Sequence, residues 1–309
     1  MGRDPLHGRG ARTNAGGRFE RFVAEAFDDG WTPEEVRPLE TIVTPELAKS
    51  IISTNQSPDI SFDQSINPYR GCEHGCIYCY ARPNHAYVGL SPGLDFETKL
   101  FVKANAAELL EAEFSKASYR PKTIMLGGVT DIYQPIERGY GVTRALLEVM
   151  ERWRHPVALI TKSQLVMRDI DILARLAERG LARAAVSITT LDRRIARVME
   201  PRAATPQRRL EAVRVLTQAG VPTTVMMAVG FDGSVCRGNG IWFTSSCSGV
   251  LCQPYQYGEK DCSESVPDCQ IGLSSGSESA LQRIAMAVRL YTYRRFWPGR
   301  LPGKRSWLH

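Results

Sequence analysis

The chain has 309 residues, of which 43% are hydrophobic and 23% charged, and its formal net charge at pH 7 is +6. This composition supports a large buried core and excludes a wholly disordered chain. No apolar run approaches the roughly 20 residues that cross a bilayer. The five arginines in the first 21 residues precede no apolar segment of the kind that a secretory signal needs. We therefore expect a cytoplasmic protein without a membrane partner.

The first part of the chain shows little hydrophobic periodicity. Residues 1–20 are rich in glycine and arginine, which predicts a mobile arm. We interpret residues 21–59 as an N-terminal extension that precedes the main domain. The basic charge of the whole chain is compatible with a polyanionic partner, although many basic proteins bind no nucleic acid.

From residue 60 onward, short apolar segments alternate with longer amphipathic ones, a pattern typical of parallel strands joined by helices. The predicted strands are Ile60–Ile66, Thr123–Leu126, Val157–Thr161, Ala185–Thr189 and Thr223–Ala228. The predicted helices are Ala106–Ser115, Thr143–Trp153, Asp169–Arg179 and Pro206–Ala219. This α/β pattern predicts a functional edge at the carboxyl ends of the strands.

The composition changes at Gly230. Residues 230–279 hold eight glycines, ten serines, five cysteines and no alanine. Neither a helical nor a strand period continues through residues 230–309, apart from a short amphipathic stretch that begins at Leu281. We hypothesise a frame change or fusion at the coding level, which would leave an irregular tail.

The eight cysteines fall into two groups. Cys72, Cys76 and Cys79 have the spacing Cys-x3-Cys-x2-Cys, and the other five lie in the tail at positions 236, 247, 252, 262 and 269. The spacing of the second group fits no motif that we can name. A full [4Fe-4S] cluster normally takes four cysteines, so three leave one iron open to a small molecule.

This motif resembles the radical SAM superfamily, whose signature has the same spacing with an aromatic residue before the last cysteine, here Tyr78. Within it, the chain most resembles the spore photoproduct lyase-like, "DNA repair photolyase" branch, over about residues 61–229. The matching segments are Asn67-Pro68-Tyr69-Arg70-Gly71-Cys72, Cys79-Tyr80-Ala81-Arg82 and Thr130-Asp131 with Tyr133-Gln134-Pro135-Ile136-Glu137.

The resemblance implies a partial (β/α)6 barrel over residues 60–229 that holds a [4Fe-4S] cluster and S-adenosylmethionine. Reductive cleavage would give a 5′-deoxyadenosyl radical that abstracts a hydrogen atom from a substrate, by resemblance a nucleic acid. It also implies a reductant such as flavodoxin or ferredoxin. Because nothing after Val229 reads as a sixth strand, we expect the barrel to be incomplete.

The resemblance further implies which residues bind S-adenosylmethionine. Lys162 would neutralise the carboxylate, Ser187 would lie beside it, and Tyr78 would face the adenine. Gly127 and Gly128 would let backbone approach the amino group. Because Val129 replaces the usual acidic residue, Thr130 or Asp131 would substitute for it.

Three other interpretations stay open. The cysteines could bind zinc, with His74 or His85, or an iron-sulfur cluster in a non-catalytic nucleic-acid-binding module, or the chain could be an inactive truncated homologue. We interpret His155 as a surface histidine without a role. The arginines that could rim a nucleic-acid site fit a solvated helix face better; they are Arg193, Arg194, Arg197, Arg202, Arg208 and Arg209.

Overall fold

A computed structural model describes residues 8–16, 18–19, 39–56 and 62–226 of the chain. Its larger sheet has six strands in the order β2-β3-β6-β7-β8-β9. The edge strand β2 (Ile52–Thr54) runs antiparallel to β3, and the other five strands are parallel. These five are β3 (Gln64–Ile66), β6 (Ile124–Leu126), β7 (Val157–Thr161), β8 (Ala182–Ser187) and β9 (Thr223–Met226).

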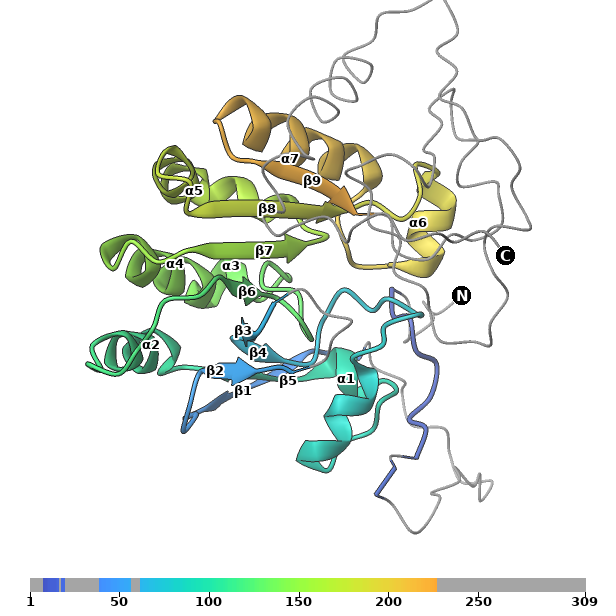
Figure 1. Ribbon diagram of the computed structural model, residues 1–309. Coiled ribbons are helices and arrows are strands. Elements are labelled where there is room, and N and C mark those ends of the chain that lie inside the picture. Colours follow the sequence, from blue (N-terminus) through green and yellow to red (C-terminus); the bar gives the residue numbers. More distant parts are fainter. Residues whose placement is uncertain (1–7, 17, 20–38, 57–61, 227–309) are drawn as a thin grey trace, which may run out of the picture.

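Four helices follow strands and pack against the sheet or against each other (Figure 1). They are α2 (Ala106–Phe114), α4 (Val142–Arg152), α5 (Ile170–Glu178) and α7 (Pro206–Gln218). Pro206 opens α7 at a position where the missing N–H costs nothing. Gly180 and Gly220, both with positive φ, follow the ends of α5 and α7. Because these five strands are parallel, their carboxyl ends all lie on one side of the molecule, towards α1 (Asp95–Thr98) and α6 (Arg193–Met199).

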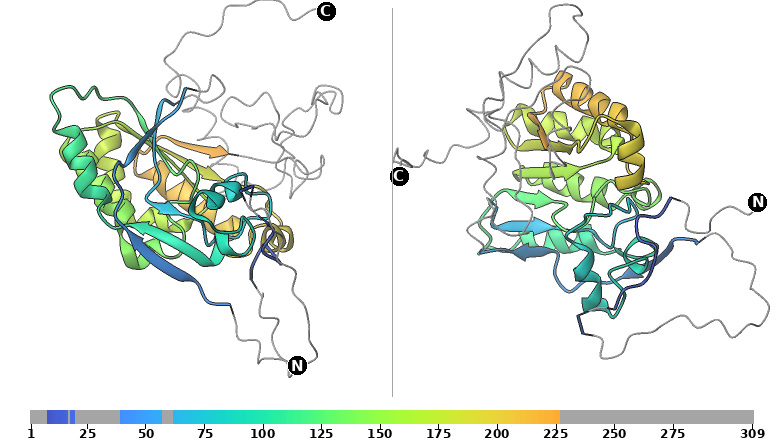
Figure 2. Two further views of the ribbon diagram at one scale, coloured as in Figure 1. Left: turned by 90° about the horizontal axis from the view of Figure 1, so that it is seen from below. Right: turned by 90° about the vertical axis from the view of Figure 1, so that its right-hand side faces the viewer.

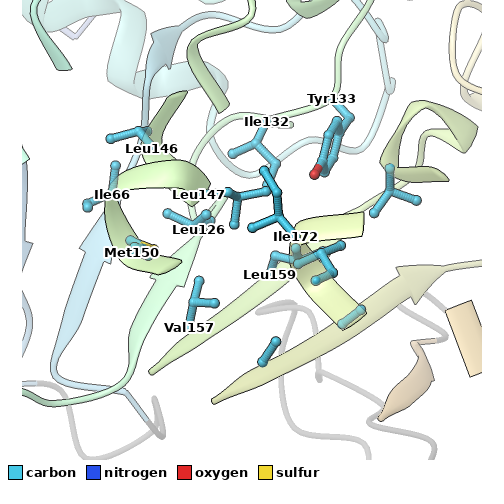
Figure 3. Close-up of a cluster of buried hydrophobic side chains, with 14 of the residues drawn as sticks. Ile66, Leu126, Ile132, Tyr133, Leu146, Leu147, Met150, Val157, Leu159 and Ile172 are labelled. Carbon is cyan, nitrogen blue, oxygen red and sulfur yellow. The ribbon is translucent and has the colours of Figure 1, made fainter. Parts of the chain in front are cut away.

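The main core lies between the large sheet and these helices (Figure 3). Leu126 and Leu159 point from β6 and β7 towards Leu147 on α4 and Ile172 on α5, and all four are at most 1% exposed. Fully burying one such side chain contributes about 1.5–3 kcal/mol. The apolar positions of the predicted helices therefore form the face that covers the sheet.

A second sheet of three strands was not predicted. Its order is β1-β5-β4, with β1 (Ile42–Glu46) parallel and β4 (Tyr69–Arg70) antiparallel to β5 (Lys99–Lys103). Figure 2 shows both sheets from two further directions. Five short helices were also missed: α1, α3 (Glu137–Tyr140), α6 and the 3-10 helices η1 (Arg82–Val88) and η2 (Gln164–Asp169).

Residues 8–16, which we call the N-terminal strap, correct the prediction of a mobile arm for that part of the chain. The buried carboxylate of Glu97 accepts hydrogen bonds from the backbone N–H groups of Gly10 at 2.9 Å and Ala11 at 2.8 Å. The Arg9 guanidinium is also buried and donates to the Glu97 carbonyl at 3.0 Å. Gly10 thus allows the strap to approach Glu97 closely, and Arg9 anchors the strap to the same residue.

The predicted α/β class and its parallel sheet are confirmed, and the five predicted strands correspond to β3, β6, β7, β8 and β9. Strand β8 begins at Ala182, three residues earlier than predicted, because Ala182 pairs with Val157. The predicted absence of a sixth strand, the irregular tail, the stretch at Leu281 and the five late cysteines all lie outside the described residues. Within the described residues, no helix is long and apolar enough to cross a membrane.

Candidate cofactor site

The three cysteines lie on a loop of residues 71–81, which we call the cysteine loop, directly after β4. Cys72 and Cys76 are buried and Cys79 is half-buried. Gly71 begins the loop with φ +74°, and a Cβ there would lie 2.7 Å from the Phe96 carbonyl oxygen. The Cys72 N–H donates to that same oxygen at 2.9 Å. Glycine is therefore needed at this position both for its φ and for its small size.

Arg82 anchors the centre of the cysteine loop. Its guanidinium donates to the Cys76 carbonyl at 2.9 Å and 3.2 Å and to the Glu97 carboxylate at 2.5 Å. The Glu97 carboxylate also accepts the N-terminal strap. A single buried carboxylate therefore connects the strap, Arg82 and the loop that carries the thiols.

The thiols are electrostatically costly to ionise in the protein alone. Burial raises the pKa of Cys76 to about 12, and the positive charge of Lys162 opposes that shift. Burial raises the pKa of Cys72 as well, with the negative charge of Asp131 acting in the same direction. A cationic group that binds the three sulfurs would displace these protons and ionise the thiols.

Lys162 follows β7 at the carboxyl edge of the sheet. Its ammonium nitrogen lies 5.7 Å from the centroid of the Tyr78 ring, a cation–π geometry. Burial by itself lowers the pKa of Lys162, but the neighbouring Cys76, Tyr78 and Glu200 outweigh burial and raise it. Among the described residues, no carboxylate lies within ion-pair distance of this ammonium. Lys162 is thus a cation without a paired anion at the edge where ligands bind in α/β sheets.

The ends of β6 and β8 offer two further features of a binding site. The Ser187 hydroxyl at the end of β8 is buried and has no hydrogen-bond partner among the described residues. Gly127 follows β6 with φ +96°, and a Cβ there would lie 2.9 Å from the Ile160 carbonyl oxygen. A Cβ on Gly128 would meet only Asn67, at 3.9 Å. Buried polar groups usually have partners, so Ser187 indicates a ligand.

Thr130 and Asp131, the two predicted substitutes for the acidic residue, are committed to the protein itself. The Thr130 hydroxyl donates to the Gly71 carbonyl at 2.7 Å. The Asp131 carboxylate accepts the Thr161 hydroxyl and the Lys162 N–H, both at 2.7 Å. Burial alone raises the pKa of Asp131, but nearby His74 and these hydrogen bonds lower it below the usual range. Both residues therefore fix loops instead of presenting free polar atoms.

Neither histidine considered for a zinc site is placed as a fourth ligand. The His85 ring contacts Phe96 edge-on, and its Nε2 lies 3.0 Å from the Lys99 carbonyl. His74 Nδ1 faces Asp131 at 3.3 Å. Among residues that the structure describes, no three His, Cys, Asp or Glu side chains are grouped as ligands of one metal ion. With both rings facing protein partners, neither imidazole is placed to complete a mononuclear Cys3His site.

Sequence reasoning missed Glu200, which lies buried under Tyr78 and receives hydrogen bonds from the Tyr78 and Thr189 hydroxyls. It also pairs with Arg209, whose side chain is only 2% exposed, so the interpretation of Arg209 as part of a solvated face is wrong. Arg209 lies on the side of α7 that faces the core. The helical spacing of the apolar residues in α7 could therefore have shown that Arg209 is buried. Nothing local marks Glu200, whose partners are distant in the sequence.

One cavity in the described part of the chain lies elsewhere. It has a volume of about 340 Å³ and is lined by Thr54, Asn55, Gln56, Asp63, Gln64 and Lys122. These residues lie at the end of β2 and at the amino ends of β3 and β6, away from the cysteine loop. The cavity therefore does not belong to the candidate site.

The family model for the radical SAM superfamily matches residues 66–234. This is more than half of the chain, which therefore belongs to the radical SAM superfamily. The match includes the cysteine loop and all five parallel strands except the start of β3. The superfamily implies a [4Fe-4S] cluster and S-adenosylmethionine as cofactors.

Similar proteins include an uncharacterized protein of Mycobacterium tuberculosis (strain CDC 1551 / Oshkosh), 36% identical over 185 residues, which cover 59% of this chain and 54% of that protein. An uncharacterized protein of Methanocaldococcus jannaschii is 28% identical over 176 residues, or 56% of this chain and 62% of that one. The chain spans about half the length of the mycobacterial relative. A solved structure of spore photoproduct lyase complexed with dinucleoside spore photoproduct is 19% identical, with a TM-score of 0.49, over 64% of this chain and 54% of that one.

Proposed function

We propose that Cys72, Cys76 and Cys79 hold a [4Fe-4S] cluster and that the edge of the sheet beside them binds S-adenosylmethionine. When bound, this pair would supply the reductive cleavage of S-adenosylmethionine and the abstraction of a hydrogen atom from the substrate. The observation that carries the proposal is a set of three features at the edge of the sheet near the thiols. These are the Lys162 ammonium without an ion-pair partner among the described residues, the unpartnered Ser187 hydroxyl and the open space beside Gly128.

Each of these groups has a chemical task in the proposal. Lys162 binds the carboxylate, because an anion that leaves water for a buried edge needs a compensating charge. Ser187 donates its unpartnered hydroxyl to the same ligand. The backbone at Gly127 and Gly128 lines the amino side, where a larger residue would fill the space. The Tyr78 ring presents its face to the adenine, with its hydroxyl turned away towards Glu200.

We extend the proposal to the reductant and the substrate. The reductant would be a small electron-transfer protein such as flavodoxin or ferredoxin. Nucleic acid is the first substrate class to test, since Arg193, Arg194 and Arg197 are exposed on α6, next to the cysteine loop. The Ile77 N–H donates to the Met199 carbonyl at 3.0 Å, which joins that loop to the end of α6.

Two substitutions test the proposed roles. In Cys76→Ala, iron, sulfide and 5′-deoxyadenosine formation should be lost together after anaerobic reconstitution and dithionite reduction, because one of three anchoring thiolates is gone. In Lys162→Ala, iron should stay and S-adenosylmethionine affinity should fall by about 1.5–3 kcal/mol, roughly 10- to 150-fold.

Lys116→Ala removes an exposed lysine far from the site and is the matched control, with unchanged iron content and affinity expected. Equal loss of iron in the variants of Cys76 and Lys162 would contradict the separation of roles. Full affinity in Lys162→Ala would show that its ammonium does not bind the carboxylate. Zinc without sulfide in protein purified anaerobically would favour the non-catalytic module instead.

A further inference from the structure

Glu200 and Arg209 form a buried ion pair whose side chains are 1% and 2% exposed. Arg209 also donates to the Ala204 carbonyl at 2.7 Å and to the Ser187 carbonyl at 3.0 Å. Burying two charges is costly, and it is tolerated only when the geometry satisfies both groups. Here the guanidinium satisfies one carboxylate oxygen and also ties α7 to the end of β8.

The other oxygen of Glu200 faces the cysteine loop. It accepts the Thr189 hydroxyl at 2.6 Å and the Tyr78 hydroxyl. The Tyr78 and Thr189 hydroxyls lie 3.1 Å apart. Tyr78 is therefore fixed at its hydroxyl end by a carboxylate that is itself held in place by Arg209.

The fixed ring of Tyr78 is also the surface on which the Lys162 ammonium rests, 5.7 Å from the ring centroid. Among the described residues, no side chain forms an ion pair with Lys162, and the Tyr78 ring is the aromatic face that its ammonium contacts. Arg209, Glu200, Tyr78 and Lys162 therefore form a continuous chain of contacts. It leads from the buried side of α7 to the edge of the sheet.

We propose that Glu200, held by Arg209, is a positioning residue that fixes the Tyr78 ring and through it aims the Lys162 ammonium at the carboxylate of S-adenosylmethionine. The inference rests on the proposed role of Lys162. Glu200 touches neither the thiols nor the ligand in this arrangement. Its effect reaches the ligand only through Tyr78 and Lys162.

The test measures S-adenosylmethionine affinity by anaerobic equilibrium dialysis of the iron-loaded protein, together with its iron content. Glu200→Gln removes the negative charge that accepts the Tyr78 hydroxyl. Tyr78→Phe removes the hydrogen bond between Tyr78 and Glu200 and leaves the buried ion pair of Glu200 with Arg209 in place. Each should weaken affinity roughly tenfold, as expected for a hydrogen bond to a charged group, and leave iron content unchanged. Tyr87→Phe, at an exposed tyrosine on η1, is the control and should leave both unchanged.

Double variants separate positioning from direct contact, because residues that act through one another are not additive. Tyr78→Phe keeps the ring face proposed for the adenine, so its combination with Lys162→Ala should bind no more weakly than Lys162→Ala alone. If the two losses add, Tyr78 acts on the ligand independently and the inference is overturned. Unchanged affinity in both Glu200→Gln and Tyr78→Phe also overturns it, and so does loss of iron in Tyr78→Phe.

The same experiment distinguishes failure of the inference from failure of the proposed function. If Lys162→Ala weakens affinity while Glu200→Gln and Tyr78→Phe do not, only the positioning role is wrong. If Lys162→Ala leaves affinity unchanged, the proposed binding of the carboxylate by Lys162 is wrong. The positioning role of Glu200 is then wrong as well, because it depends on Lys162. Should Glu200→Gln fail to fold, Tyr78→Phe still decides the question.

Discussion

His155 lies between the end of α4 and the start of β7, stacked on Phe114 with ring centroids 4.3 Å apart. Its Nδ1 lies 3.0 Å from the Pro156 carbonyl and its Nε2 2.8 Å from the Tyr119 hydroxyl. A neutral imidazole that donates from Nδ1 and accepts at Nε2 satisfies both contacts. His155 is therefore a buried structural residue, and its interpretation as a surface histidine is wrong.

This burial predicts a loss of stability in acid. Burial lowers the pKa of His155 to about 4 in the folded chain, against about 6.5 when unfolded. The folded state thus binds fewer protons, so the contribution is present above pH 6.5 and is lost as the pH falls towards 4. Between pH 7.5 and 5.5 we expect a loss of about 1 kcal/mol from this group.

Urea unfolding of the wild type and His155→Gln at both pH values measures this contribution. The variant should lose about 1 kcal/mol less than the wild type over the same interval. Comparing the two pH dependences cancels the other titrating groups. Identical pH dependences would show that His155 takes up no proton on unfolding.

At the scale of single residues, the chemistry of the cysteine loop could be predicted because it is local in sequence. Three thiols and Tyr78 lie within eight positions, and Lys162 directly follows a strand that is easily recognised. The Glu200 carboxylate could not be found in this way, because its partner Tyr78 is 122 positions away. The roles of Thr130 and Asp131 depend equally on distant carbonyl, hydroxyl and N–H groups.

At the scale of elements, the N-terminal strap makes its closest approach at Gly10. A Cβ on Gly10 would lie 1.8 Å from the Gly75 carbonyl oxygen in the cysteine loop. Any side chain there must separate the strap from the loop. The separation would also remove two N–H donors from the buried Glu97 carboxylate, a loss of about 1–3 kcal/mol.

Gly10→Ala should therefore release the strap. We expect faster trypsin cleavage after Arg9, which is buried in the wild type, and faster loss of iron from reconstituted protein in air. Gly139→Ala is the matched control, since no atom lies within 4 Å of a Cβ at Gly139. Equal cleavage rates in wild type and Gly10→Ala would contradict the role of the strap.

The elements that could be predicted are those whose apolar pattern is long enough to recognise. The main helices and the five parallel strands belong to this class, because each buries a face against the core. Strand β4 has only two residues and β1 contains Pro45, so neither shows a usable pattern. Both are strands only because β5 lies between them, a pairing that is not local in sequence.

At the scale of the whole molecule, the hydrophobic contacts of the described residues divide into two clusters. The large one fills the space between the main sheet and its helices, and a separate small one contains Cys72, Ala81 and Phe96. The cysteine loop is held mainly by polar contacts to segments outside the large core. These polar contacts include α1 at Phe96 and the end of α6 at Met199, and the strap packs closely against the loop at Gly10.

This division predicts that cofactor binding stabilises one side of the molecule selectively. A ligand that binds only the folded form stabilises the segments that it contacts. Because local unfolding depends on local contacts, amide hydrogen exchange should slow mainly in those segments. Loading with iron and sulfide should slow amide hydrogen exchange roughly tenfold in residues 8–16, 71–82 and 199–203. Exchange in α4, α5 and β7 should stay unchanged. Cys76→Ala, treated identically, should show no slowing, and a uniform change over both groups of segments would contradict the division.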